Sequence, residues 1–450
     1  MKRRVLLVSR DFAPSLAPSA QSATKLAKYL VRAGFEVTVL TGEANGGRDA
    51  LLKADLAAGC GRVLRASTLP AFSFLSRLFA RPLRSRKSDS SLPRLACEDV
   101  RELPEGNSFV NAARGWFFSH RIKKQERSFY RAALAYVSHA GLDLSHYDVM
   151  ISAYSPMSSH MVALALKAKC PTIRWIADFR RTPPRAYPAP LCRYYRRCQK
   201  RLLLHCDTLT ASSTALIKEL LPRGRRVRTA VIPNGFDPED LMRIPVADAD
   251  EKRPFTICLT PSDESLRADF SPLFSAVSDL IKTGRVRRDQ IVFEYYGSHK
   301  RGEELAKQIS EMELPPLFYD RGKASRMEVL SAERSAQLLV CPAFDRRAER
   351  GEIPEKFMEA LMLQKPVIAL LYGDVTGGEF SRMMRALRVG VLWEEEDGEE
   401  SYEFLKKYIA ESYTYWRTMS RDLYEPDEKR YRAHSYDNLI RQWAEVIFDF

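Results

Sequence analysis

Short apolar runs alternate with stretches of helical periodicity along most of the 450 residues. A short apolar run is typical of a strand buried on both faces, and such strands belong to parallel sheets whose crossovers are helices. The sequence therefore predicts an α/β protein with two Rossmann-like sheets in series. The expected strands cover residues 5–9, 37–41, 149–152, 172–176, 208–211 and 229–233 in the first half, and 255–260, 291–296, 337–341, 366–371 and 389–392 in the second.

Helical periodicity fills the gaps between these strands. The clearest helix is expected over 21–33, where Gly34 supplies a left-handed C-cap before the next strand. A last helix is expected over 436–448. Two segments break the alternation: a long irregular insertion at 43–115, and the polar, proline-bounded stretch 245–254, which we predict to connect two domains.

The insertion contains aromatic and basic residues side by side, in the stretch LPAFSFLSRLFARPLRSRKS. Two interpretations are open for this stretch. It is a helix that lies in a membrane interface, with its aromatic side chains among the headgroups and its cations on anionic lipid. Alternatively, it is a helix packed on its own domain with a solvated basic edge.

The charge of the chain is unevenly distributed. The net charge is +14, but residues 1–250 hold 41 basic and 21 acidic residues, whereas 251–450 hold 30 and 36. Such an excess suggests a negatively charged partner for the first half: nucleic acid, an anionic membrane surface or an acidic small molecule. The basic segment 193–201 also carries apolar residues at core-like spacing, and no nucleic-acid-binding motif is present. We therefore predict a solvated or membrane-facing basic surface and no nucleic-acid partner.

The sequence gives no sign of membrane insertion or secretion. The apolar run 5–8 is too short for a signal peptide, and no run approaches the roughly 18 apolar residues of a membrane span. The eight cysteines form neither a C-x-x-C pair nor a zinc-like group, which favours reduced structural thiols. We predict a cytoplasmic protein, with peripheral attachment to the inner face of the membrane as an option.

The stretch most informative about chemistry is RGEIPEKFMEALMLQKPVIAL, residues 350–370. It predicts a turn at 351–354, a helix at 356–363 and a strand at 366–370. The backbone N–H groups and the dipole of a helix N-terminus bind phosphate. Lys356 in the first turn adds a point charge for a diphosphate, and Glu359 on the same face can accept hydrogen bonds from ribose hydroxyls. Taken alone, the same pattern is also common on solvated helices.

The stretch resembles the donor-binding signature of retaining, family 4-like glycosyltransferases of the GT-B fold, in the form G-x-x-P-x-K-x-x-E. Further segments resemble this family in the same order: VLLVSRDFAP with TKLAKYLVRAGFEVTVLTG, YDVMISAYSPMSSHMVALAL, WIADFRRTP, CDTLTASS with VIPNGFDPED, and FYDRGKASRMEVLSAERSAQLLVCP. The ordered set covers nearly the whole chain outside the insertion.

The resemblance implies two Rossmann-like domains that face a central cleft. The first, acceptor-side domain is expected at 1–233, with the 43–115 insertion and a returning C-terminal helix at 434–450. The second domain, at 234–433, is expected to bind the nucleotide sugar. Transfer then proceeds by front-face attack with retention of configuration, and it requires no metal and no cofactor beyond the UDP- or GDP-linked donor. The implied acceptor is a cell-envelope glycan or a lipid-linked molecule.

The resemblance also implies roles for individual residues. Lys356 and Arg267 are expected to neutralise the leaving diphosphate, and Glu359 to bind the ribose. Other residues are assigned by position: Gly351, Glu352 and Ile353 to the donor sugar or phosphate, Gly297, Gly322 and Lys323 to the base, His160 and Asp178 to catalysis, and Ser19 and Arg180 to the acceptor side. Asp178 and Arg180 follow a predicted strand, where open α/β sheets place their ligands.

Three positions depart from the family pattern. Gly351 stands where the family has the first of two glutamates, Ala17 and Ala20 flank a loop where many members have paired glycines, and the strand ending near Thr260 lacks the usual glycine. Two alternatives to a glycosyltransferase therefore stay open: a binding or scaffold protein that has lost activity, and a sugar-nucleotide epimerase of the same fold.

Overall fold

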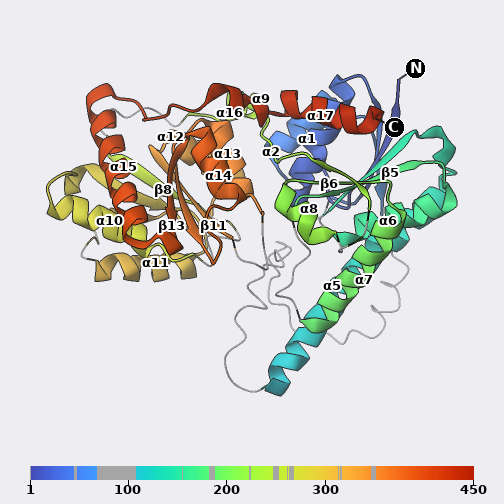
Figure 1. Ribbon diagram of the computed structural model, residues 1–450, viewed down its shortest axis with the longest axis horizontal. Helices are drawn as coiled ribbons and strands as arrows, with labels where there is room; N and C mark the ends of the chain where they lie inside the picture. The colour runs from blue at the N-terminus through green and yellow to red at the C-terminus, as the bar shows by residue number, and fades with distance from the viewer. Residues whose placement is uncertain are drawn as a thin grey trace, which may run out of the picture. The chain divides into compact units, whose positions relative to one another are not determined.

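The structure is a computed structural model that describes residues 2–44, 48–67, 108–154, 156–181, 188–221, 224, 226–246, 253–260, 262, 268–312, 314, 317–345 and 351–449. The chain divides into two compact units (Figure 1). Unit 1 comprises Met1–Ile232 and Ile440–Phe450, and unit 2 comprises Pro233–Leu439. Each unit is built on one parallel sheet with helical crossovers, which confirms the predicted α/β class.

Unit 1 contains a seven-stranded parallel sheet of order β3-β2-β1-β4-β5-β6-β7. The strands are β1 Arg4–Val8, β2 Glu36–Gly42, β3 Arg62–Ala66, β4 Val149–Ala153, β5 Arg174–Phe179, β6 Thr208–Ala211 and β7 Arg228–Val231. The helices are α1 Pro18–Arg32, α2 Ala50–Gly59, α5 Ser108–His139, α6 Met157–Lys169, α7 Ala189–His205 and α8 Thr214–Leu220. The last helix of the chain, α17 Tyr436–Phe448, has the predicted bounds, and its residues from Ile440 onward belong to unit 1.

Alternate residues of β1 reach opposite faces of this sheet. Leu6 and Val8 join the core formed with α5, α6 and α7, whereas Val5 and Leu7 are buried outside that core cluster. Helix α1 ends as predicted, because Gly34 adopts φ +90° and a residue with a Cβ atom enters that region only at a cost.

Unit 2 contains a six-stranded parallel sheet of order β10-β9-β8-β11-β12-β13. The strands are β8 Phe255–Leu259, β9 Ile291–Tyr295, β10 Phe318–Asp320, β11 Leu338–Phe344, β12 Val367–Tyr372 and β13 Gly390–Glu394. The helices are α9 Pro238–Arg243, α10 Ser271–Lys282, α11 His299–Glu311, α12 Arg326–Ser335, α13 Glu355–Leu363, α14 Glu379–Leu387, α15 Gly398–Met419 and α16 Glu428–Ala433. Figure 1 shows α10 and α11 on one face of this sheet and α13 and α14 on the other.

The prediction of an irregular insertion at 43–115 is wrong in part. Helix α2 and strand β3 lie inside it, and β3 pairs with β2 at the edge of the unit 1 sheet. The strand was missed because Arg62 and Arg65 interrupt its apolar residues, and an edge strand tolerates such charged side chains. The aromatic and basic stretch at 69–88 lies outside the described residues.

The predicted interdomain connection at 245–254 is also wrong, since unit 2 already begins at Pro233. Helix α9 before it is held by α12, whose Arg334 side chain donates to the carbonyl oxygens of Leu241 and Ile244. In addition, Ser331 donates to the Pro245 carbonyl at 3.0 Å. Pro245 and Val246 at one end of the stretch, and Arg253 and Pro254 at the other, are described and belong to unit 2.

No described helix combines the length and the apolar character needed to cross a membrane. The seven cysteines in the described part of the chain are all free thiols.

Candidate functional site

The candidate site of unit 2 lies where its strand order reverses. Strand β8 has β9 on one side and β11 on the other, so the crossovers that follow β8 and β11 leave in opposite directions. Ligands of open α/β sheets bind at the carboxyl ends of such strands. Thr260 directly follows β8, and the loop after β11 leads into the first turn of α13, which contains Lys356.

A chain of alternating charges joins α13 to α12 at this point. The Lys356 Nζ atom lies 2.6 Å from Glu333 Oε1 and 2.9 Å from Glu359 Oε2. The Arg326 Nη2 atom lies 2.8 Å from the other oxygen of Glu359. Thr260 adds a hydrogen bond at 2.6 Å from its hydroxyl to Glu333 Oε1. Each helix contributes one cation and one carboxylate.

Burial and the neighbouring charges shift the pKa values of these groups in opposite directions. The Glu333 side chain is 1% exposed and Lys356 is 11% exposed. Burial raises the pKa of Glu333 even though the Lys356 ammonium lowers it. Burial by itself lowers the pKa of Lys356, but the two carboxylates outweigh burial and hold that pKa above its ordinary value. Burial likewise opposes ionisation of Glu359, yet Lys356 and Arg326 lower its pKa to about 2.

Among the described residues, only the Oε1 atom of the Glu333 carboxyl group has hydrogen-bond or ion-pair partners. Its Oε2 atom is buried and has no hydrogen-bond partner among the residues that the structure describes. A buried carboxyl oxygen without a partner is costly, so Glu333 Oε2 is available to accept a hydrogen bond from a further donor.

The turn before α13 has the predicted form. Gly351 adopts φ +74°, and Pro354 is the N-cap residue without a side-chain capping bond. Ile353 is buried, and its carbonyl oxygen accepts a hydrogen bond of 3.5 Å from Asn234. Glu352, which stands between Gly351 and Ile353 in the chain, is half-buried.

Two of the predicted base-binding glycines meet at the same edge of the sheet. The Gly297 N–H, after β9, donates to the Gly322 carbonyl oxygen, after β10, at 2.9 Å. Gly322 adopts φ +69°, and Lys323 beside it is exposed. Arg267 lies outside the described residues.

In unit 1, the acceptor-side candidate Ser19 lies at the carboxyl end of β1. Its hydroxyl donates to Asp11 Oδ2 at 2.9 Å, and Arg10 pairs with the same carboxylate at 3.2 Å. Strand order reverses between β1 and β4, so this loop occupies the switch point of the unit 1 sheet.

His160, on α6, is completely buried. Its Nδ1 atom lies 2.7 Å from the Ser152 hydroxyl, and its ring packs against Phe179 and Tyr154 with centroids 4.4 and 5.9 Å apart. Burial lowers the pKa of His160 to about 3, so the ring is neutral at pH 7. The structure therefore places His160 beneath the surface of unit 1, and a role in contact with an acceptor requires the ring to be uncovered.

Asp178 is buried at the end of β5 and forms an ion pair with Arg180, whose side chain is 13% exposed. Arg180 Nε lies 2.8 Å from Asp178 Oδ2, and Thr210 donates to the other oxygen at 2.7 Å. The Arg180 guanidinium also donates to the Ile232 carbonyl oxygen at 2.8 Å and lies over the Trp443 ring at 5.5 Å. Both oxygens of Asp178 are thus already engaged.

Sequence reasoning missed several residues that complete these sites. Arg326 and Glu333 are seven residues apart on α12, which places them on one face two turns apart, and that spacing was the available signal. In unit 1, Glu126 is buried and accepts a hydrogen bond of 2.5 Å from the Ser158 N–H at the start of α6. Burial raises the pKa of Glu126, although Arg10 lowers it.

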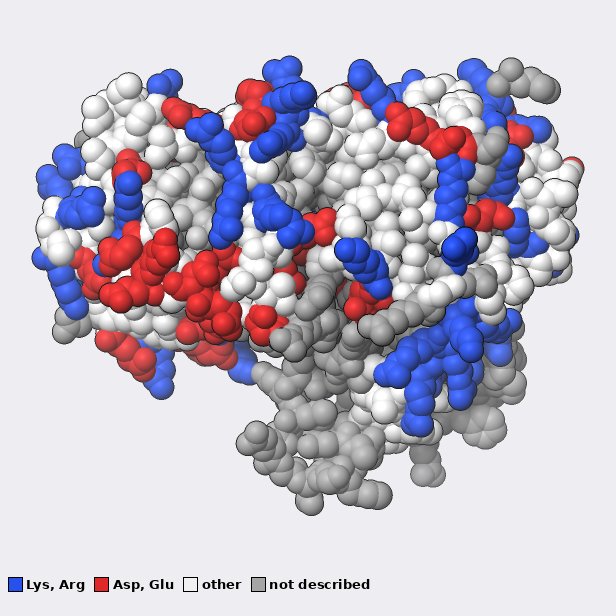
Figure 2. Space-filling view, in the orientation of Figure 1, with Lys and Arg blue, Asp and Glu red and all other residues white. Residues whose placement is uncertain are grey.

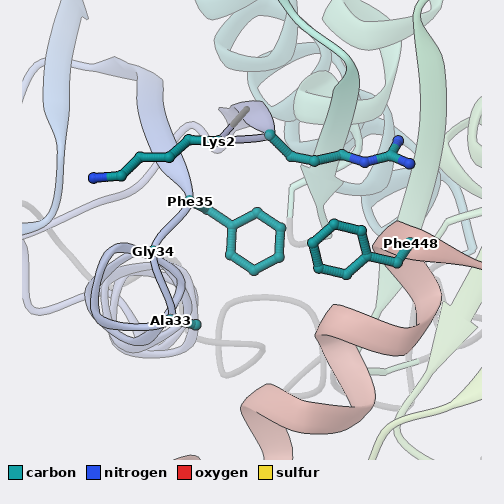
Figure 3. Close-up of a pocket in the computed structure, with 6 residues that line it drawn as sticks. Lys2, Ala33, Gly34, Phe35 and Phe448 are labelled. Atoms are coloured by element: carbon teal, nitrogen blue, oxygen red, sulfur yellow. The ribbon is translucent and has the colours of Figure 1, made fainter.

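A pocket of about 490 Å³ lies elsewhere on unit 1 (Figure 3). It is lined by Lys2, Arg3, Ala33, Gly34, Phe35 and Phe448. Figure 3 shows the rings of Phe35 and Phe448 facing each other, and their centroids are 5.4 Å apart. Lys2 and Arg3 precede β1, and the segment 33–35 precedes β2, so this part of the pocket lies at the amino ends of these strands, opposite to the carboxyl ends that form the switch point.

Comparison with known proteins supports the fold. Residues 19–235 match the family described as "Glycosyl transferase 4-like domain". No curated protein sequence matches the chain. Among solved structures, the chain is similar to the sucrose-phosphate synthase from Thermosynechococcus elongatus, with a TM-score of 0.58 and 15% identity over 100% of this chain and 99% of that chain.

Two further structures have the same architecture. The α,α-trehalose 6-phosphate synthase from Burkholderia multivorans gives a TM-score of 0.57 at 12% identity, over 100% of this chain and 99% of that chain. The pneumococcal O-GlcNAc transferase, solved with UDP and GlcNAc, gives 0.53 at 10% identity, again over 100% and 99%. At these identities the likeness concerns the fold alone. The chain has the fold of the GT-B glycosyltransferases, and its residues 19–235 match a glycosyl transferase 4-like domain.

Proposed function

We propose that the protein is a retaining glycosyltransferase that uses a UDP- or GDP-linked sugar bound by unit 2. The acceptor is a cell-envelope glycan or a lipid-linked molecule bound by unit 1. The observation that carries the proposal is the Lys356 ammonium at the N-terminus of α13, held at the switch point of a Rossmann-like sheet by Glu333 and Glu359.

Lys356 supplies positive charge where the reaction generates negative charge. The leaving nucleoside diphosphate gains charge in the transition state, and a fixed ammonium beside a helix N-terminus stabilises that charge. The ammonium has two carboxylate partners in this structure, so it can exchange one of them for a phosphate oxygen and keep the other.

Glu359 is suited to bind the ribose of the donor. The cations of Lys356 and Arg326 lower its pKa, so it stays ionised and accepts hydrogen bonds from hydroxyl groups. Because Arg326 fixes one of its oxygens at 2.8 Å, the orientation of the carboxylate is set before a ligand arrives.

Retention is proposed from the family resemblance. In front-face attack, the leaving diphosphate takes the proton of the acceptor hydroxyl, and no side chain forms a covalent intermediate. Under this mechanism the enzyme positions the two substrates and stabilises the leaving group. Ser19 and Arg180 stay predictions for the acceptor side, and His160 and Asp178 stay predictions for catalysis.

Isothermal titration calorimetry with UDP, GDP and their sugars tests donor binding. We expect one nucleoside diphosphate to bind, and Lys356→Met to weaken its binding by about 100-fold, as expected for a lost charge-assisted hydrogen bond. Lys365→Met is the matched control, because Lys365 is 13% exposed and pairs with Asp422 at 2.5 Å in the same unit. If no nucleoside diphosphate binds, or if both variants bind equally well, the proposal fails.

Product analysis by NMR tests the reaction type. Formation of a glycoside with the anomeric configuration of the donor supports a retaining transferase. An inverted product contradicts retention, and an epimerised free nucleotide sugar formed without acceptor contradicts transfer altogether.

A further inference from the structure

Helix α5 presents two aromatic side chains to solvent near its N-terminal end. Trp116 is 55% exposed and Phe117 is 67% exposed, whereas the next residue, Phe118, is buried. The Trp116 ring meets Phe117 edge-on at 5.2 Å and stacks on His120 at 5.5 Å. Large exposed aromatic side chains that lie together indicate a contact surface.

Helix α7 carries a stripe of cations. Its exposed basic residues are Arg193, Arg196, Arg197, Lys200 and Arg201. This spacing follows i, i+3, i+4, i+7 and i+8, so the side chains share one face, while Leu191, Tyr195 and Leu202 are buried on the other. Figure 2 shows the cluster of basic side chains over α7.

No described carboxylate neutralises this stripe. Helix α7 contains no acidic residue, and the only one on α5 is Glu126, which is buried. Within the described part of the chain, none of the five cations of α7 forms an ion pair. Three further exposed cations of α5, Lys124, Arg127 and Arg131, have the same sign.

The two helices form one surface. The Lys123 ammonium lies 5.7 Å from the centre of the Tyr194 ring, and the Tyr195 hydroxyl donates to Glu126 at 3.3 Å. Gly115 of α5 lies against Pro188, the N-cap residue of α7. The helices are therefore parallel and in contact, as Figure 1 shows. We call the exposed side chains of 116–131 and 193–204 on these helices the α5–α7 face.

We propose that the α5–α7 face binds an anionic lipid bilayer, with Trp116 and Phe117 in the headgroup region and the cations of α7 on lipid phosphates. Aromatic rings beside a basic helix face are what interfacial binding requires, because the rings gain apolar contact and the cations gain Coulomb energy. The exposed Leu204 extends the stripe of α7 by one further turn with an apolar side chain.

A lipid surface fits this face better than a nucleic acid does. Nucleic-acid binding through aromatic residues requires an open ring face on which a base can stack. One face of Trp116 is already covered by the His120 ring, at an angle of 21° between the planes. The exposed parts of Trp116 and Phe117 are therefore suited to insert into an apolar medium.

Vesicle flotation with the full-length protein tests the inference. The probes are vesicles of phosphatidylcholine alone and vesicles that contain 30 mol% phosphatidylglycerol, in ~0.1 M salt. We expect binding to the anionic vesicles only. The triple variant Arg196→Gln, Arg197→Gln and Lys200→Gln is expected to weaken this binding by about 100-fold, from three cations lost at the surface.

A matched triple variant controls for net charge: Lys53→Gln, Lys282→Gln and Lys307→Gln, three exposed lysines outside the α5–α7 face. It is expected to bind vesicles like the wild type, and thermal unfolding checks that both variants are folded. The variant Trp116→Ser, Phe117→Ser is expected to bind more weakly and to be released completely by ~0.5 M salt, because only the screened attraction is left.

Three outcomes overturn the inference: equal binding to neutral and anionic vesicles, equal loss of binding in both triple variants, or tighter binding to single-stranded or duplex DNA than to anionic vesicles. The test uses no nucleotide and no turnover. Its failure is therefore distinguishable from failure of the proposed glycosyltransferase activity.

Discussion

The Lys356 ammonium lies 2.6 Å from a carboxylate oxygen of Glu333, and this contact joins the first turn of α13 to the last turns of α12 at the switch point of unit 2. The Glu333 side chain is buried, that of Lys356 is 11% exposed, and the second oxygen of Glu333 has no described partner. The contact between Lys356 and Glu333 therefore holds an ammonium and a carboxyl group at this site before any ligand binds.

Replacement of Lys356 by methionine is expected to lower the free energy of unfolding by about 3 kcal/mol, since it leaves the buried carboxylate of Glu333 without its cation. The double variant Lys356→Met, Glu333→Met is expected to recover most of that loss, because the uncompensated charge is removed as well. Urea unfolding of the wild type, both single variants and the double variant measures the coupling. A double variant no more stable than Lys356→Met would contradict this account.

Diphosphate binding to unit 2 is expected to be accompanied by proton uptake at Glu333. Burial already raises the pKa of this carboxyl, and the negative charge of a bound diphosphate raises it further. Calorimetry in two buffers of different ionisation enthalpy measures the protons taken up, and the variant Glu333→Gln is expected to take up fewer. Equal proton uptake by wild type and variant assigns the effect to another group.

His160 is expected to make the protein less stable as the pH falls below about 6.5. The ordinary pKa of histidine is about 6.5, and burial lowers the folded-state pKa of His160 to about 3. Between these values the unfolded chain holds a proton that the folded chain lacks, so stability decreases by up to about 1.4 kcal/mol per pH unit. In denaturant unfolding from pH 7 to 4, His160→Gln is expected to lack this part of the pH dependence. An unchanged slope would show that the buried ring is accessible to protons.

The variant Asp178→Asn is expected to destabilise the protein by about 2–3 kcal/mol, because the half-buried guanidinium of Arg180 then lacks a carboxylate partner. Thr210→Val removes only the hydrogen bond to the other oxygen and is expected to cost about 1 kcal/mol. Thermal and urea unfolding give both values. If Asp178→Asn leaves stability unchanged but abolishes transfer, the residue acts on the substrate rather than on Arg180.

Much of the fold could be predicted from local patterns. The short apolar runs located eleven of the strands, the bounds of α17 were correct, and Gly34 has the predicted positive φ. Strands β3 and β10 were missed, since β3 is interrupted by arginines and β10 is only three residues long. Such short edge strands form because a neighbouring strand offers free hydrogen-bonding groups, which the local sequence does not reveal.

The sequence by itself determined the strand and helix periodicity, and it placed Lys356 and Glu359 one turn apart on a helix that begins after a glycine turn. These features follow from interactions between residues that are close along the chain. Only the tertiary structure decided that Glu333 and Arg326 become their partners and that His160 is buried. The physical reason is that these contacts join residues that are distant along the chain, and the packing of helices on a sheet selects which charged faces meet and which side chains lose contact with water.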